Sequence, residues 1–346
     1  MWGAAGVVAA VGVVGVVAWA VAHSNGSATD AVLTLAQQTK PDARNGALDQ
    51  ASAAATKAAN DFSKMIKSDP WRYGHIIAAG VAVLGLLFAD VIRPGSLERA
   101  GKRDVNTFGP HIWFLCGVLV MGMQMVAGGF NTMLPDKWLG DAGSIQGDAV
   151  KSGVIYAVSI LTAYLLAKLI SASAKGAGLA FTARSTAWGL MAFILAWPIV
   201  QASSFGFLAM NTRFKGPEAG SNIAHDTLAK LVSHKDDPWA WVLAGLAVVA
   251  APVVEEVVYR GFLQSSILRM TEKPWVSIIV TSAMFAAVHM VGKQPVPWYA
   301  AATIGTLGLC MGIAYERTKE IGVPITMHVL FNLTNVILAM YTTRGA

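Results

Sequence analysis

Two adjacent carboxylates, Glu255 and Glu256, end a long apolar stretch and are followed four residues later by Arg260. A charge inside a membrane-length apolar segment costs on the order of 2.5–3.5 kcal/mol to insert, so such residues usually face a protein interior. On a helix, Glu256 and Arg260 share a face and can form an ion pair, whereas Glu255 points about 100° away and can face a cavity. The stretch therefore predicts either a reactive carboxylate beside a supporting ion pair, or a structural ion pair at a cytoplasmic helix end.

Two further apolar stretches downstream carry polar side chains. His289 follows Phe285 by four residues, and His328 and Asn332 are also four apart, so each pair shares one helical face. A single histidine in a membrane segment is more often a packing residue than a catalyst. Two histidines and an asparagine, all close downstream of the glutamates, favour one shared polar cavity.

This set of side chains suits the hydrolysis of an amide bond. A carboxylate in a low-dielectric pocket gains proton affinity and can take a proton from water. A neighbouring imidazole can orient that water, and a second imidazole with an amide N–H can stabilise the oxyanion. Two histidines and a glutamate are also zinc ligands. The Glu-Glu-Arg grouping brings its own countercharge, which favours a mechanism without zinc or another cofactor.

Three motifs occur in order on successive apolar stretches: Glu-Glu-x-x-x-Arg at 255–260, Phe-x-x-x-His at 285–289 and His-x-x-x-Asn at 328–332. This triple resembles the type II CAAX prenyl protease and bacteriocin-processing (CPBP) family of intramembrane glutamic proteases. The resemblance covers about residues 239–341. It implies these catalytic roles: Glu255 with His289 activates water, Glu256 with Arg260 supports the site, and His328 with Asn332 stabilises the oxyanion.

The resemblance implies an intramembrane endopeptidase that cuts a peptide bond in a membrane-associated peptide or protein. The alternative is a non-catalytic membrane scaffold or a bacteriocin-immunity-type protein with the same fold. Every motif residue is present, which favours the enzyme. The expected partners are this substrate and the lipid bilayer, and no run of basic residues indicates nucleic acid.

The elements that must position these residues are membrane helices. The chain has 346 residues, of which 55% are hydrophobic and only 13% charged, against roughly 25% charged in soluble domains. We expect an all-α, polytopic membrane helix bundle with about nine transmembrane helices, or eight if the first is cleaved. The expected spans are 1–22, 74–92, 111–130, 152–170, 187–210, 239–258, 275–291, 298–314 and 322–341.

Composition divides the chain into four parts. Residues 1–22 form an N-terminal membrane anchor, and residues 23–73 form an exterior polar segment with an Ala-rich amphipathic helix. Residues 74–210 supply the membrane helices of the scaffold. Residues 239–341 form the catalytic membrane domain.

Basic residues predict the orientation. Alternate loops carry Lys and Arg, among them Arg99, Arg103, Lys175 and Lys319, whereas the opposite loops are more acidic. By the positive-inside rule the basic loops are cytoplasmic. We expect an integral protein of a bacterial cell (inner) membrane, with Glu255 and Glu256 near the cytoplasmic side.

Overall fold

The computed structural model describes residues 63–342, apart from 65, 102, 142, 217–225 and 292–294. Every regular element in this part of the chain is a helix, which confirms the all-α fold class. The expected anchor at 1–22 and most of the polar segment at 23–73 lie outside the described residues.

The chain divides into two compact units, Met1–Leu84 and Gly85–Ala346. The described part of the first unit is mostly helix α4 (Pro70–Phe88), which runs on into the second. Pro70 suits the first position of a helix because its missing N–H has no partner there in any case. The Asp69 carboxylate accepts the N–H of Arg72 at 3.0 Å and so caps the helix start.

The second unit is a bundle of membrane-length helices. Seven helices among the described residues, α4 included, are long and apolar enough to cross a membrane, and α14 is a shorter apolar helix. They correspond to the eight spans expected after the first, and confirm an integral membrane protein. The principal helices of the bundle are α6 (Pro110–Phe130), α8 (Ile145–Ser173), α9 (Ala183–Lys215), α11 (Pro238–Gly245), α12 (Ala251–Glu256), α13 (Gln264–Thr271), α14 (Pro274–Val288), α15 (Trp298–Thr318) and α16 (Gly322–Thr342).

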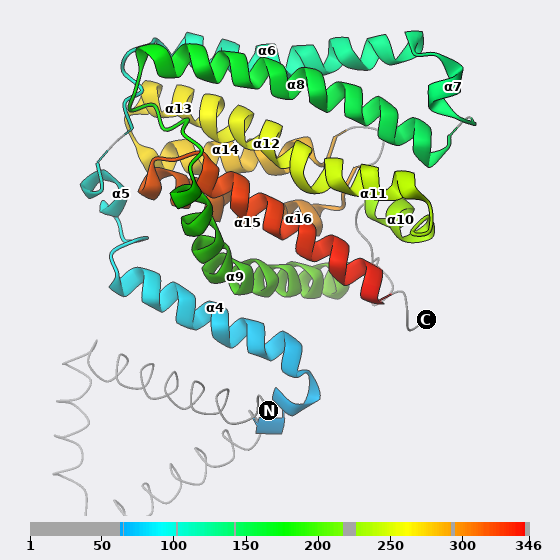
Figure 1. Ribbon diagram of the computed structural model, residues 1–346. Helices are drawn as coiled ribbons and strands as arrows, with labels where there is room; N and C mark the ends of the chain where they lie inside the picture. Colours follow the sequence, from blue (N-terminus) through cyan, green and yellow to red (C-terminus); the bar gives the residue numbers. More distant parts are fainter. Residues whose placement is uncertain are drawn as a thin grey trace, which may run out of the picture. The chain divides into compact units, whose positions relative to one another are not determined.

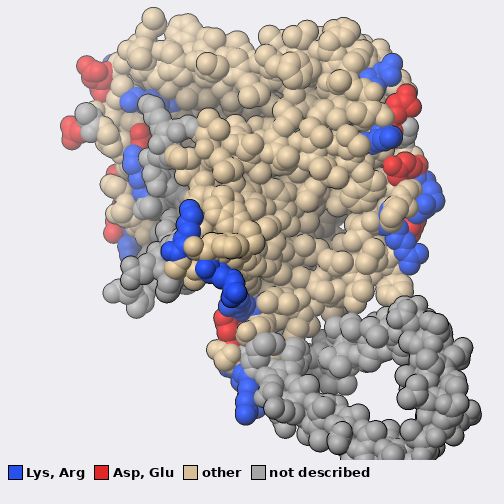
Figure 2. Space-filling view, turned by 180° about the vertical axis from the view of Figure 1, so that it is seen from behind, with Lys and Arg blue, Asp and Glu red and all other residues tan. Residues whose placement is uncertain are grey.

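Helix α6 packs along α8, and α9 packs against both α15 and α16 (Figure 1). Helices α11, α12 and α13 follow one another as a single helix that contacts both groups. Short helices α5 (Ser96–Arg99), α7 (Asp136–Leu139) and α10 (Asp226–Ser233) lie in the connections. On the face of the bundle shown in Figure 2, most charged side chains gather at two opposite edges, and most of the surface between them is uncharged.

The central helix runs without a break from Pro238 to Thr271, 34 residues in all. It starts where the Asp237 carboxylate accepts the N–H of Trp239 at 2.9 Å. The expected span ended at residue 258, near the glutamates. In the structure the helix continues to Thr271, so Glu255 lies near its middle and not near its end.

Two π-helical turns lie within this continuous helix: Leu246–Ala250 (η3) and Val257–Leu263 (η4). They lie on either side of α12, which carries both glutamates. A π-helical turn holds an extra residue per turn and often marks a functional site. The sequence analysis did not predict these turns.

A buried polar network joins the loop before α6 to helices α13 and α15. Arg103 and Glu316 form an ion pair of 2.7 Å with both side chains fully buried. Arg103 also donates to the Ser265 hydroxyl at 2.7 Å and stacks on the ring of Tyr315 at 4.1 Å. Glu316 accepts a second bond from Gln264 at 2.8 Å. Arg103 belongs to one of the basic loops singled out in the sequence, and its side chain is buried in the core.

Candidate active site

The predicted ion pair is present at the centre of the bundle. Arg260 Nε lies 3.3 Å from Glu256 Oε2, and both side chains are fully buried. These two atoms attract as charges, because the angle between them is not that of a hydrogen bond. Arg260 also donates weakly to the carbonyl of Gly308 on α15, at 3.5 Å. The central helix is therefore tied to α15 at this level.

His328, on α16, lies close to both glutamates of the central helix. Its Nδ1 lies 2.9 Å from Glu256 Oε1, and its Nε2 lies 3.8 Å from Glu255 Oε2. Glu256 is fully buried, whereas the Glu255 side chain is 29% exposed. The two glutamates therefore differ in the way that their spacing from Arg260 predicted. Glu256 pairs with Arg260, and Glu255 is the accessible carboxylate.

His289 reaches the same level because α14 is short. The chain from Glu256 to Thr271 has 16 residues, nearly the same number as α14, which has 15, or about 22 Å of helix. After the turn at 271–274, α14 therefore ends beside the glutamates, and His289 follows its last residue as the C-cap. His289 Nδ1 bonds to the carbonyl of Phe285 at 2.7 Å. The imidazole lies within electrostatic range of Glu255.

Phe285 is the apolar centre of this group. Its ring meets those of His289, His328 and Tyr259 edge to face, with centroids 4.9, 5.6 and 5.1 Å apart. The guanidinium of Arg260 lies 4.8 Å from the same ring, a cation–π distance. Phe285 is fully buried. One ring therefore positions two imidazoles and a guanidinium.

Asn332 lies on α16 one turn after His328. Its Nδ2 donates to the backbone carbonyl of Ala247 in the central helix, at 2.9 Å. The structure therefore brings five of the six predicted residues into one connected cluster and places Asn332 beside it, against the π-helical turn η3.

Two tyrosines that sequence reasoning did not single out lie within electrostatic range of Glu255: Tyr156 on α8 and Tyr259 on the central helix. Tyr259 follows Glu255 by four residues, a spacing that would have identified it. Nothing in the sequence marks Tyr156, because its position depends on how α8 packs against α12.

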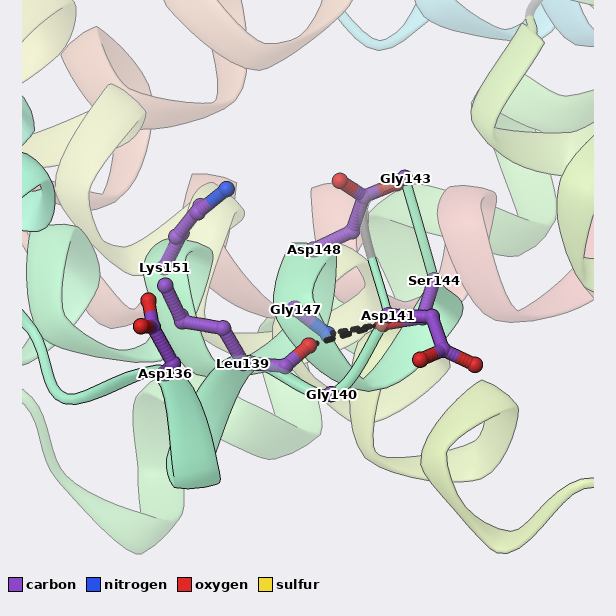
Figure 3. A pocket seen from close by; sticks show the side chains of 9 residues that line it. All are labelled: Asp136, Leu139, Gly140, Asp141, Gly143, Ser144, Gly147, Asp148 and Lys151. Atoms are coloured by element: carbon purple, nitrogen blue, oxygen red, sulfur yellow. Dashed lines mark hydrogen bonds between the residues drawn. The ribbon is translucent and has the colours of Figure 1, made fainter.

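A pocket of about 300 Å³ lies away from these residues, where α7 meets the start of α8. Figure 3 shows its acidic side chains Asp136, Asp141 and Asp148 together with Lys151. Asp148 forms an ion pair with Lys230. No predicted site residue lines this pocket. In the described part of the chain, no three His, Cys, Asp or Glu side chains are grouped as metal ligands.

Comparison with known proteins supports the resemblance seen in the motifs. Residues 237–334 match the family model described as type II CAAX prenyl endopeptidase Rce1-like. The match begins at the start of the central helix and contains all three motifs. No curated protein and no solved structure matches the chain. Residues 237–334 thus form an Rce1-like domain, and this match supports the similarity of this part of the chain to the CAAX-type (CPBP) family.

Proposed function

We propose that this protein is an intramembrane endopeptidase that cuts a membrane-associated peptide or protein with water activated by Glu255. The observation that carries the proposal is the position of Glu255. It is the accessible member of a buried carboxylate pair, 3.8 Å from one imidazole and within electrostatic range of a second. Such a carboxylate can act as a general base within a polar site enclosed by apolar helices.

His289 orients the attacking water in this mechanism. Its Nδ1 faces a backbone carbonyl, which only accepts hydrogen bonds, so Nδ1 carries the proton. The neutral ring then presents the lone pair of Nε2, which can accept a bond from the water while Glu255 takes its other proton.

His328 stabilises the oxyanion. Its Nδ1 donates to the Glu256 carboxylate, so Nε2 can donate as well only when the ring is an imidazolium. In that state His328 and Arg260 balance the charges of Glu255 and Glu256. The four groups together are then neutral, which lowers the cost of burying them. Asn332 supplies a further N–H to the oxyanion.

The proposal is tested by comparing the membrane peptides of cells that carry the wild-type protein with those of cells that carry Glu255→Ala. The substrate should accumulate uncut in the Glu255→Ala cells. Glu98→Ala is the matched control, because Glu98 is exposed on α5, outside the membrane helices. Identical peptide profiles in all three strains would favour the non-catalytic scaffold.

A further inference from the structure

Pro252 leaves one backbone carbonyl of the central helix without a helical donor. In the π-helical turn η3, each N–H bonds the carbonyl five residues earlier, as Ala251 does to Leu246. The next donor in this register is Pro252, which has no N–H. Its acceptor would be Ala247, whose α-helical donor, Ala251, already bonds to Leu246. The Ala247 carbonyl therefore has no donor within its own helix.

Asn332 supplies the missing donor from another helix. Its Nδ2 lies 2.9 Å from the Ala247 oxygen. One turn earlier on the same face of α16, His328 bonds to Glu256. Two side chains of α16 thus attach to the central helix on either side of Pro252, one through a carboxylate and one through a carbonyl.

Asn335, also on α16, bonds differently from Asn332. Its Nδ2 donates to the carbonyl of Phe331, four residues earlier in its own helix, at 2.9 Å. Such a local bond can form at any helical asparagine. Asn332 instead bonds across the helix interface, where an acceptor is free.

We infer that Pro252 is a positioning residue for the reaction, acting through the side-chain amide of Asn332. An asparagine amide has two N–H groups. The Ala247 carbonyl binds one of them, which fixes the plane of the amide and hence the direction of the other. This inference rests on the proposed function, in which the second N–H meets the oxyanion. A proline three residues before the catalytic base thereby sets the geometry of a group on another helix.

The hydrogen bond between Asn332 and the Ala247 carbonyl is tested by thermal melting, which needs no substrate. Asn332→Ala should lower the Tm of the purified protein by roughly 2–8 °C, because it leaves a carbonyl unpaired. In a Pro252→Ala background, residue 252 has an N–H that can bond to Ala247. The Tm loss caused by Asn332→Ala should then fall to less than half. Asn335→Ala is the control, and its effect should be the same in both backgrounds.

The positioning role is tested by kinetics on a peptide that accumulates in the Glu255→Ala cells. Pro252→Ala should lower kcat by roughly 10- to 100-fold with KM unchanged, because the Asn332 amide is no longer held. Its Tm should not fall, since removing a proline from a helix interior does not destabilise it. A lower kcat with an unchanged KM and Tm indicates that a transition-state contact is misplaced. General damage to the fold would lower the Tm as well.

Equal Tm losses from Asn332→Ala in both backgrounds, or a normal kcat in Pro252→Ala, would overturn the inference. Cleavage by the wild type would remain in either case, so the proposed function would stand. If the Tm losses are coupled but the wild type cuts no peptide, the hydrogen bond stands, and the catalytic role of Pro252 falls together with the proposed function.

Discussion

Glu255 and Glu256 are neighbours in the chain, but their side chains lie in different surroundings. Glu256 is fully buried between Arg260 and His328, whereas Glu255 keeps an accessible carboxylate. Two ionisable groups in such contrasting environments are the usual basis for assigning separate roles in a reaction.

Glu255→Gln should abolish cleavage while the protein still folds and inserts, because the amide keeps the shape but cannot accept a proton. The loss expected for a general base is roughly 10²–10⁴-fold in kcat. Cleavage assays on the purified variant beside Glu98→Gln measure this. Near-normal turnover by Glu255→Gln would remove this residue from the mechanism.

Arg260→Ala should impair folding as well as activity, because it removes the guanidinium that pairs with the buried Glu256. Breaking a buried ion pair costs about 3–5 kcal/mol. Thermal melting of the purified protein is the measurement. Arg260→Lys keeps the charge and should recover part of the stability, although it loses the contact of the guanidinium with the Phe285 ring. An unchanged Tm in Arg260→Ala would show that the pair contributes little.

Chelation and pH together separate the glutamic mechanism from a zinc mechanism. If Glu255 is a plain base, activity survives extended chelation and rises with pH as the carboxyl loses its proton. A stoichiometric metal in the active protein, lost together with activity, would contradict this mechanism.

Local spacing predicted part of this cluster. The pairs Glu256–Arg260 and Phe285–His289 are four residues apart on single helices, so their contacts follow from helical geometry. The contact of His328 with Glu256 joins separate helices and depends on how α16 packs. The Asn332 partner could not be predicted, because Ala247 becomes an acceptor only through the π-helical turn.

At the scale of elements, the end of the bundle opposite the acidic pocket is held by the buried pair of Arg103 and Glu316. Hydropathy and charge counts place Arg103 in a basic loop, but they say nothing about the burial of its side chain. Its burial depends on Ser265 and Tyr315, more than 150 residues away in the chain. No local pattern records such contacts.

Arg103→Ala should destabilise the protein strongly. Glu316 is then left buried with Lys319, 3.7 Å away, as its remaining ion-pair partner. The expected cost is about 3–5 kcal/mol. Arg99→Ala is the matched control, since Arg99 pairs with Asp90 at 2.7 Å on the exposed surface. The control should melt close to the wild type. Similar melting of both variants would show that burial adds nothing to the Arg103 pair.

At the scale of the whole molecule, charged side chains lie at two opposite edges of the face shown in Figure 2. The basic loops that carry Arg99, Arg103 and Lys319 meet at one end, where Lys319 bonds to the carbonyl of Gly101 at 2.6 Å. Hydropathy predicted the membrane helices well, because the need for about 20 apolar residues is local. It set the end of the central span 13 residues too early, because part of α13 is polar yet buried among other helices.

The orientation can be measured with a membrane-impermeant maleimide on intact cells. Asp141→Cys, at the acidic end, should be labelled from outside, and Glu98→Cys, at the basic end, only after the cells are opened. The parent for both variants replaces Cys116 and Cys310 with alanine, so that each carries one thiol. The reverse pattern would place the basic loops outside.

The short helix α14 has a consequence for solvent. Each peptide bond cut consumes one water molecule, and lipid chains supply none. At His289 the backbone leaves the helix at the level of the glutamates, and its carbonyl accepts the N–H of Val296 at 2.9 Å. Irregular backbone at membrane depth is tolerated only where protein encloses it or water reaches it. Helix α14 has 15 residues and α15 has 21, so α14 is six residues, or about 9 Å of helix, shorter. Bulk water must be admitted to about this depth for turnover.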